Sequence, residues 1–531
     1  MSLLQIRKLS MAIHGTPILK DVSLEIAAGE IHGVIGESGS GKSMTAFSVM
    51  QLLPDGAACS GQILLDDVSV LDAGEADLCA MRGDAVGMVF QEPMTALNPV
   101  MSIGDQVAET ILIHEDVSKA DAMARAQAAL ERCELPADKF PMTRFPHELS
   151  GGQRQRVVIA MAIALRPKLL IADEPTTALD VTTQAEILDL IRKLVDEDGM
   201  GVMLITHDLA VVTGLADRIS IMKDGCVVEQ GAAATLHRDM THPYTKALFA
   251  ASAHQPDRNE RPGEAPLLQV EGLVRRYSLP RKSLFGPAQS FEAVDDVSFE
   301  VKKGESLGLV GESGCGKSTL TRAILGLERV QAGKIFMEGV PVLSGGRVQT
   351  SVRRKMQVVF QDPYGSFNPR HRVGRLVSEP FFLHGRKASA VEIDEALVSV
   401  GLAPHDKHKY IHEFSGGQRQ RIAIARALII KPELIILDEA VSALDVSIRA
   451  QILDLLADLS TQFGLTYLFI SHDLSVVRSI TDRVLVMKSG KFVEEGSTET
   501  VFENPAHPYT KSLIAAAPRL PDMDDMQGVT P

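Results

Sequence analysis

The sequence predicts an α/β protein that contains two tandem copies of one domain. The segment GESGSGKS at 36–43 returns as GESGCGKS at 311–318, and each copy follows a short buried-strand pattern and precedes a helical one. In both halves, short apolar runs alternate with helical patterns, as expected for a sheet core covered by helices. At 531 residues, the chain also exceeds the length at which a single hydrophobic core keeps growing. We therefore expect two domains of the same fold class.

The two copies align along their length and change offset only between motifs. Leu3 matches Leu267, 264 positions later, whereas Lys42 matches Lys317, 275 positions later, so the second copy carries an 11-residue insertion within 276–294. A polar stretch rich in proline and charge separates the copies, and we expect it to be a flexible linker. The expected boundaries are a first domain at 2–250, the linker at 251–266, a second domain at 267–518 and a tail at 519–531.

Composition and hydropathy argue against several classes of protein. The formal net charge is −14 and no Lys/Arg-dense block is present, so we expect no nucleic acid partner. Arg7 and Lys8 stand where an export signal would need its apolar stretch. The longest clearly apolar run, 157–165, is well short of the roughly 18 residues of a membrane span. If this protein works at a membrane, we expect another chain to cross it.

The five cysteines are widely separated and odd in number. Without C-x-x-C spacing, they indicate reduced cytosolic thiols rather than a disulfide framework or a metal site. They are Cys59, Cys79, Cys133, Cys226 and Cys315.

The repeated glycine-rich segments fit G-x-x-x-x-G-K-[ST], the pattern of a phosphate-binding loop. In this pattern, glycines let backbone N–H groups converge on phosphate oxygens at the start of a helix, and the lysine reaches the terminal phosphates. Two matches in matching contexts predict two nucleotide sites. The candidate binding residues are Gly36, Ser38, Gly39, Ser40, Gly41, Lys42, Ser43 and Met44 in the first half, and Gly311, Ser313, Gly314, Cys315, Gly316, Lys317, Ser318 and Thr319 in the second.

Three further motifs follow each loop at matching spacings: a signature sequence, an apolar strand pattern that ends in Asp-Glu, and a histidine after one more strand. They are 149–153 (LSGGQ), Asp173-Glu174 and His207 in the first half, and 414–418 (FSGGQ), Asp438-Glu439 and His472 in the second. Together with the loops, this set resembles the ATP-binding cassette (ABC) ATPases throughout both halves. The resemblance implies two tandem ABC-type P-loop NTPase domains, each with a mixed-sheet core, a helical subdomain and a C-terminal extension.

The resemblance also implies a role for each residue in ATP hydrolysis, with Mg²⁺ as a cofactor. Phosphoryl transfer to water needs little covalent help, but the developing charge must be neutralised and the water positioned. Glu174 and Glu439 would polarise the attacking water, and His207 and His472 would sense or stabilise the γ-phosphate. The P-loop hydroxyl, the Q-loop glutamine and the strand-end aspartate would hold the metal; these residues are Ser43, Gln91, Asp173, Ser318, Gln361 and Asp438.

Both signature sequences open predicted helices, so their backbone N–H groups form an anion site with no phosphate nearby in the same domain. The family resolves this by head-to-tail pairing, in which the signature of one domain closes on ATP held by the P-loop of the other. The fused chain leaves open whether this ATP sandwich forms within one chain or between two. The implied residues are Ser150, Gly151, Gly152 and Gln153 in the first half, and Ser415, Gly416, Gly417 and Gln418 in the second.

Three features resemble the ATPases of bacterial importers of the dipeptide/oligopeptide/nickel class. They are FQEPMTALNP and FQDPYGSFNP around the Q-loops, the near-identical motifs of the two halves, and HPYT near the end of each half. The resemblance implies a peripheral protein on the cytoplasmic face of the inner membrane. Its partners would be two transmembrane permease subunits, contacting a groove between Q-loop and helical subdomain, and a periplasmic or extracellular solute-binding protein. Those subunits select the solute, so peptide import rests on the resemblance alone.

Two departures from the family pattern concern the active sites. The adenine-stacking aromatic of the family is Tyr277 in the second half, whereas Ile13 stands at the same offset in the first. Because base stacking stabilises binding, we expect weaker ATP affinity in the first half. Ala440 stands where the first half has Pro175, but both glutamates remain, so we expect two hydrolytic sites.

A third departure concerns the segment after HPYT, where many relatives carry several cysteines that hold an iron-sulfur cluster. No cysteine follows Cys226 in the first half or Cys315 in the second. We therefore expect no iron-sulfur cluster.

The alternative function is that of a soluble tandem ABC ATPase acting on ribosomes. Such proteins usually carry a long charged helical linker, whereas this linker is short and the chain is acidic. A DNA-repair ABC protein fits less well, because paired cysteines and long coiled-coil heptads are missing.

Overall fold

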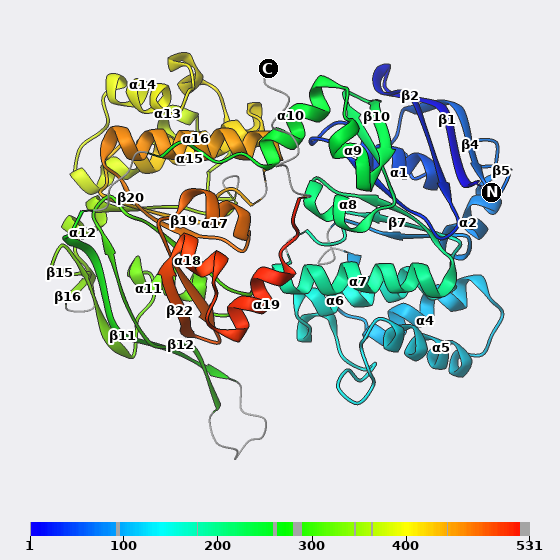
Figure 1. The fold of residues 1–531 in the computed structure, drawn as a ribbon, viewed down its shortest axis with the longest axis horizontal. Coiled ribbons are helices and arrows are strands. Elements are labelled where there is room, and N and C mark those ends of the chain that lie inside the picture. Colours follow the sequence, from blue (N-terminus) through cyan, green and yellow to red (C-terminus); the bar gives the residue numbers. More distant parts are fainter. Residues whose placement is uncertain are drawn as a thin grey trace. The chain divides into compact units, whose positions relative to one another are not determined.

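The computed structural model describes residues 2–91, 96–177, 179–258, 263–279, 289–344, 347–362, 365–442 and 444–520. Parts of the expected linker, insertion, tail and Q-loop segments lie outside the described residues: 259–262, 280–288, 521–531, 92–95 and 363–364. The chain forms two compact units, Met1–Ala253 and His254–Ala517 (Figure 1).

The first unit contains two sheets. One is antiparallel with the order β2-β1-β4-β5, and the other has the order β10-β9-β3-β8-β7-β6. In the second sheet, β9, β3, β8, β7 and β6 are parallel and β10 is an antiparallel edge strand. The strands are β1 (Ser2–Ile13), β2 (Thr16–Ala27), β3 (Ile31–Ile35), β4 (Ala57–Leu65), β5 (Val68–Ser69), β6 (Val86–Val89), β7 (Leu169–Asp173), β8 (Gly201–Ile205), β9 (Arg218–Lys223) and β10 (Cys226–Ala232).

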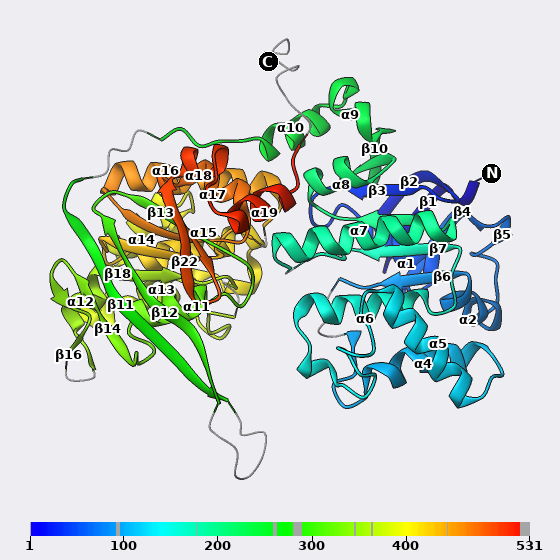
Figure 2. The ribbon, with the colours of Figure 1, turned by 60° about the horizontal axis from the view of Figure 1, so that its bottom comes forward.

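The helices of the first unit fall into three groups. The first group follows the P-loop or covers the sheets. The second group consists of α4, α5 and the start of α6, and it lies at one end of the unit (Figure 2). The third group, α9 and α10, follows β10. The helices are α1 (Lys42–Met50), α2 (Glu75–Asp84), α4 (Ile103–His114), α5 (Lys119–Arg132), α6 (Gly151–Ile163), α7 (Val181–Asp198), α8 (Leu209–Leu215), α9 (Ala233–Asp239) and α10 (Pro243–Ser252).

The second unit repeats both sheets, with the orders β12-β11-β14-β15 and β18-β19-β20-β13-β21-β22. It adds a two-stranded hairpin, β16-β17. The strands are β11 (Pro266–Leu279), β12 (Gln289–Lys302), β13 (Ser306–Val310), β14 (Ala332–Met337), β15 (Val340–Pro341), β16 (Leu343–Ser344), β17 (Arg347–Val348), β18 (Met356–Val359), β19 (Leu434–Asp438), β20 (Thr466–Ile470), β21 (Arg483–Lys488) and β22 (Lys491–Ser497).

The helices of the second unit follow the same plan, except that the 3-10 helix Glu379–His384 takes the place of the second half of α4. The 3-10 helix Ile411–Glu413 repeats Pro146–Glu148 of the first unit. The predicted tandem α/β fold with mixed-sheet cores is confirmed. The helices are α11 (Lys317–Ile324), α12 (Thr350–Lys355), α13 (Val373–Ser378), α14 (Ala390–Ser399), α15 (Gly416–Leu428), α16 (Val446–Phe463), α17 (Leu474–Ile480), α18 (Thr498–Glu503) and α19 (Pro508–Ala516), and the 3-10 helices are Glu379–His384, Pro404–His408 and Ile411–Glu413.

Each P-loop helix lies between the two sheets of its unit. In the first unit, Ala46 and Val49 of α1 share a core with Ile6 of the antiparallel sheet and Ile171 of the parallel one. Successive residues of a strand point to opposite faces of the sheet. The residues next to Ile171 in β7 therefore point to the other face, where they pack against the helices that cover it. This packing fixes the P-loop at the end of an interior strand, next to the ends of the neighbouring parallel strands.

The register of the first hairpin in each unit locates the insertion. β1 and β2 pair Ile13 with Thr16, and β11 and β12 pair Tyr277 with Phe291. Met11 pairs with Leu19, and their counterparts Arg275 and Val294 pair in the second unit. Because the same positions pair on both sides, the additional residues lie between Tyr277 and Phe291. Ile13 and Tyr277 therefore occupy equivalent places, as the alignment predicted.

Candidate functional site

Each P-loop joins an interior strand of the parallel sheet to a helix that begins at the predicted lysine. Gly41 and Gly316 precede these helices with φ of 102° and 116°, values that favour glycine. A Cβ on Gly41 would lie 2.6 Å from Leu19 Cδ2, and a Cβ on Gly316 would lie 2.1 Å from the Ala293 carbonyl oxygen. The loops therefore need glycine here for both conformation and space.

The two P-loop lysines are held in the same way. Lys42 Nζ donates to the carbonyl oxygens of Gly36 at 2.7 Å and Glu37 at 3.0 Å. Lys317 makes the same two bonds in its own loop, at 2.6 and 2.9 Å. Both side chains are buried, so each loop contains a positive charge shielded from bulk water.

The other predicted loop residues surround these lysines. Ser40 and its counterpart Cys315 are buried, and Cys315 Sγ lies 3.8 Å from Lys317 Nζ. Burial raises the pKa of the Cys315 thiol, which keeps it protonated. Exposed turn residues and first-turn helix residues complete the loops; they are Ser38, Gly39, Ser313 and Gly314, and Ser43, Met44, Ser318 and Thr319.

The catalytic candidates stand directly after two buried strands. β7 ends at Asp173 and β19 at Asp438, and the following Glu174 and Glu439 have left-handed φ values of 49° and 51°. The Glu174 N–H donates to the Ile205 carbonyl at 2.8 Å, which ties this conformation to the neighbouring strand. A non-glycine residue in this region costs of order 1–3 kcal/mol, so the same strain at both glutamates indicates a positional requirement.

Glu174 is surrounded by hydrogen-bonding side chains. Its carboxylate lies 3.2 Å from His207 Nδ1 and accepts from Gln91 Nε2 and Thr177 Oγ1, both at 2.9 Å. Burial raises the pKa of this carboxyl, but the hydrogen bond and charge of His207, with the bonds from Thr177 and Gln91, outweigh burial and lower it to about 2. Glu174 is therefore ionised at neutral pH.

The second unit keeps only part of this network. Glu439 Oε1 lies 3.3 Å from His472 Nδ1, and this histidine lowers the pKa of Glu439 against the raising effect of burial. Ser442, the counterpart of Thr177, donates instead to the Glu439 backbone carbonyl at 3.0 Å. Within the described part of the chain, Gln361 makes no hydrogen bond to Glu439, so this carboxylate has fewer fixed donors.

The strand-end aspartates lie beside the P-loop hydroxyls. Burial raises the pKa of Asp173, helped by the charge of Glu174, while a hydrogen bond with Ser43 opposes this shift. Asp173 Oδ1 is buried and, among the described residues, has no hydrogen-bond partner. Hydroxyl, carboxamide and carboxylate oxygens are the donor set that Mg²⁺ prefers, and a buried carboxylate oxygen with no other partner fits such an ion.

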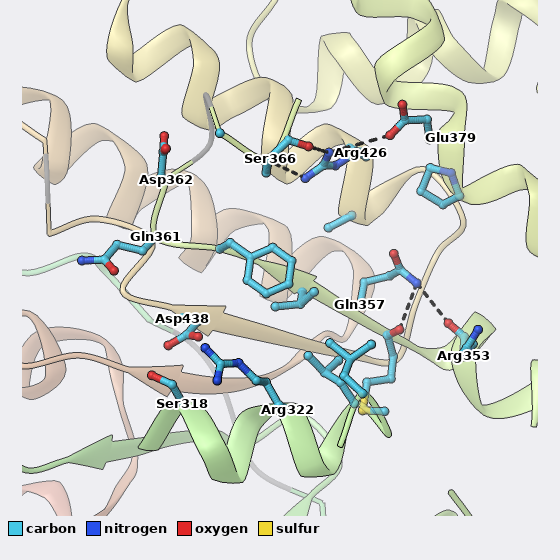
Figure 3. A pocket seen from close by; sticks show the side chains of 18 of the residues that line it. Ser318, Arg322, Arg353, Gln357, Gln361, Asp362, Ser366, Glu379, Arg426 and Asp438 are labelled. Carbon is cyan, nitrogen blue, oxygen red and sulfur yellow. Dashed lines mark hydrogen bonds and ion pairs between the residues drawn. The ribbon is translucent and has the colours of Figure 1, made fainter. Parts of the chain in front are cut away.

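Beside Asp438, the second unit contains an additional positively charged side chain, Arg322. In Figure 3, Ser318 and Asp438 point toward each other and Arg322 points toward both. Burial raises the pKa of Asp438, the charge of Glu439 adds to this, and Arg322 and Lys317 oppose it. The first unit has Phe47 in place of Arg322.

The signature sequences cap their helices identically. Ser150 is the N-cap of α6, where its hydroxyl accepts from Gln153 N at 3.3 Å and its own N–H donates to Gln153 Oε1 at 3.0 Å. Ser415 and Gln418 form the same capping box on α15, at 3.4 and 3.0 Å. The glycines between them, Gly151-Gly152 and Gly416-Gly417, form the first turn of each helix.

A cavity of about 780 Å³ runs from the strand-end aspartate of the second site to the helical part of the unit (Figure 3). Ser318 and Asp438 line one end. The rest of the lining combines charged side chains, among them Arg353, Glu379 and Arg426, with exposed apolar ones: Leu327, Phe360 and Phe382. The equivalent positions of the first unit are also exposed and apolar: Leu52, Phe90 and Leu112.

Comparison with known families identifies this architecture. A model described as ABC transporter matches 19–177 and 294–442, which together exceed half of the chain. The chain belongs to the ABC transporter family. A second model, described as the C-terminal region of oligopeptide/dipeptide transporters, matches 228–272 and 493–530 of this ABC ATPase.

Relatives of this ABC ATPase include importer subunits. The glutathione import ATP-binding protein GsiA of Salmonella typhimurium is 46% identical over 540 residues, covering 94% of this chain and 86% of the relative. GsiA of Escherichia coli O157:H7 is 45% identical over 538 residues, with the same coverage. A solved dimeric ATP-binding cassette with ADP and phosphate is 32% identical, covers 43% of this chain and 98% of its own, and has a TM-score of 0.39. The relatives support a transport function over the ribosomal alternative. Among the described residues, no helix is both long and apolar enough to cross a membrane.

Sequence reasoning missed several residues around the ABC sites. Thr177 donates to Glu174, and Arg322 faces Asp438, yet neither belongs to a motif that the sequence analysis used. Glu328, which accepts a hydrogen bond from Tyr277, was also missed. An available signal was the comparison of the two halves, since Arg322 and Glu328 replace the apolar Phe47 and Leu53.

Proposed function

We propose that this chain is the ATP-hydrolysing subunit of a bacterial importer for peptide-like solutes, bound peripherally to the cytoplasmic face of the inner membrane. The observation that carries the proposal is a complete set of groups in each unit: a buried P-loop lysine, an aspartate at the end of a buried strand and a glutamate in contact with a histidine. The match to the oligopeptide/dipeptide region and the similarity to glutathione importers support the solute class, because glutathione is itself a small peptide.

In this proposal, the P-loop backbone N–H groups and Lys42 or Lys317 hold the phosphates of ATP. When bound, Mg²⁺ would neutralise charge on the phosphates, held by Ser43, Gln91 and Asp173 or by Ser318, Gln361 and Asp438. Glu174 and Glu439 accept a hydrogen bond from the attacking water and orient it toward the γ-phosphate. His207 and His472 hold these carboxylates in place and keep them ionised.

The exposed first turns of α6 and α15 are proposed to bind the phosphates of ATP held in the other unit, with Ser150–Gln153 and Ser415–Gln418 as the contacting segments. Helix N-termini favour anions, and the first glycine of each helix, Gly151 or Gly416, is exposed at the surface. Closure with ATP and reopening after hydrolysis would drive the membrane partners between two states.

The cavity next to the second site is proposed to receive a segment of a transmembrane permease subunit. The equivalent face of the first unit is proposed to receive a segment of a second permease subunit. Exposed Phe360 and Phe382 supply apolar contact area beside charged groups, as in many protein interfaces. A solute-binding protein outside the inner membrane would complete the importer.

Co-purification with the permeases encoded next to this chain's gene, followed by reconstitution, tests this function. Turnover of ATP should rise when a solute-binding protein loaded with glutathione or a short peptide is added. Glu174→Gln and Glu439→Gln should each keep nucleotide binding and lower turnover. Failure to bind permeases, together with binding to ribosomes in co-sedimentation, would support the alternative.

A further inference from the structure

The hairpin that carries Tyr277 passes directly beside the second P-loop. A Cβ on Gly316 would lie 2.1 Å from the carbonyl oxygen of Ala293 in β12. Phe291 lies two residues further along the same strand, about 7 Å away, and pairs with Tyr277. A nucleotide whose phosphates lie in the loop can therefore place its base against this end of the hairpin.

A single carboxylate, Glu328, fixes the Tyr277 side chain. Tyr277 Oη donates to Glu328 Oε2 at 2.5 Å, and Arg275 Nε donates to the same oxygen at 2.9 Å. The Arg275 guanidinium also lies over the Tyr277 ring, 4.2 Å from its centroid, and Arg322 Nη1 lies 3.5 Å from Glu328 Oε1. The hydroxyl end and one face of the ring are thus occupied by these groups, and the ring cannot turn without breaking a charge-assisted hydrogen bond.

Burial raises the pKa of Glu328, but the hydrogen bonds from Tyr277 and Arg275 outweigh burial and lower it. The carboxylate is therefore ionised at neutral pH, which strengthens both bonds.

The first unit replaces this whole cluster with apolar side chains. The matching register of the two hairpins places Met11 and Ile13 where Arg275 and Tyr277 stand. Phe47 and Leu53 take the places of Arg322 and Glu328 after the P-loop, and all four side chains belong to or pack against one hydrophobic core. The four positions lie in three separate segments, and all four are polar in the second unit and apolar in the first. The polar cluster is therefore a single feature of the second unit.

We propose that Glu328 is a positioning residue that holds the Tyr277 ring for stacking on the base of the nucleotide bound in the second unit, a device that the first unit lacks. The proposal rests on the proposed ATP site at Lys317. It predicts that Glu328 affects the affinity for the base-containing part of the ligand and leaves phosphate binding unchanged. The second site should therefore depend more strongly on the nucleobase than the first.

The test uses the full chain with Lys42→Ala, so that titration calorimetry reports the second P-loop. ATP and inorganic tripolyphosphate serve as probes, because only ATP offers a base to stack on. Glu328→Leu and Glu328→Gln should weaken ATP binding about five- to ten-fold and about three-fold, respectively, with tripolyphosphate binding unchanged. In a double-mutant cycle, Glu328→Leu should add no further loss to Tyr277→Ile, because both remove the same stacking interaction.

Glu392→Gln is the matched control. Glu392 accepts two hydrogen bonds from Arg386 on the exposed surface of the same unit, so it reproduces the loss of an ion pair away from the site. Equal weakening of ATP and tripolyphosphate by Glu328→Leu, or additive losses with Tyr277→Ile, would overturn the positioning role. If the Lys42→Ala parent binds neither probe, the proposed site at Lys317 fails and this role fails with it.

Discussion

Substituting alanine for each of the two glycines of a signature sequence should have different effects on stability and ATPase activity. The second unit offers the clearer pair. A Cβ on Gly417 would lie 2.5 Å from Ile448 Cγ2 of α16, whereas a Cβ on Gly416 would meet no atom within 4 Å. Gly417 is buried and Gly416 is exposed at the first position of α15. Gly417→Ala therefore tests packing, and Gly416→Ala tests access to the backbone N–H groups of the helix.

The structure sets the expected magnitudes. Gly417→Ala forces Ile448 or the helix to move, and overpacking of this kind costs about 1–3 kcal/mol. The higher helix propensity of alanine offsets up to about 1 kcal/mol of this cost. The net loss of about 1 kcal/mol should lower Tm by about 2–4 °C for a unit of this size. Gly416→Ala has only the favourable propensity effect, so its stability should be unchanged or slightly higher.

Scanning calorimetry and steady-state ATPase assays separate the two effects. Gly416→Ala should melt like the parent protein and lose ATPase activity, because its methyl group occupies the surface where phosphate must approach. Gly417→Ala should melt at lower temperature, and its activity should fall with its stability. A lower Tm for Gly416→Ala together with an unchanged Tm for Gly417→Ala would refute this reasoning. The first unit provides a repeat of the experiment with Gly151 and Gly152, whose added Cβ atoms would lie 3.5 Å from Leu179 Cδ2 and 2.2 Å from Thr183 Cγ2.

Three further outcomes are expected. Ile13→Tyr should strengthen ATP binding at the first site by about 1 kcal/mol. This is the low end of the range for base stacking, because the groups that fix Tyr277 are missing in the first unit. Calorimetry with the second P-loop inactivated measures the change, and an unchanged affinity would contradict it. His207→Ala should raise the pKa of Glu174 from about 2, because burial raises this pKa and His207 opposes the effect of burial. The ionised carboxylate is lost as pH falls through its pKa. The acid limb of the ATPase pH profile should therefore move to higher pH. Chelation of Mg²⁺ should abolish hydrolysis in both units, and loss in only one unit would argue against equivalent oxygen donor sets.

Local sequence patterns were sufficient for the parts of the site that a single element positions. The P-loop lysines begin helices and the strand-end aspartates end buried strands, as the flanking patterns predicted, because periodicity and glycine placement determine these features locally. The capping boxes at Ser150 and Ser415 are equally local, since Ser and Gln three residues apart satisfy each other's backbone.

Contacts between distant segments could not be predicted in this way. Gln91 and Glu174 are 83 positions apart, and their hydrogen bond depends on how β6 and β7 align in the sheet. The left-handed φ of Glu174 and Glu439 follows from the hydrogen bond of each N–H to the next strand, and no residue preference signals it. Glu328 reaches Tyr277 only because α11 packs under the β11 strand pair, so no local sequence pattern signals its role.

The two units differ more around the base-stacking residue than in the order of the hydrolytic groups. The aspartate, glutamate and histidine of each site stand at or just after the ends of parallel strands, and the lysine begins the helix that follows another of these strands. Backbone pairing of the strands fixes their positions. The residues around Tyr277 stand on an antiparallel hairpin and after a helix, where a side chain can change without moving the strand ends. Nucleotide affinity can therefore differ between the units while the contact between glutamate and histidine stays the same, at 3.2 and 3.3 Å. Since one chain carries both units, each copy always occurs with the other, and a weaker first site paired with a stronger second one can be maintained as a fixed combination.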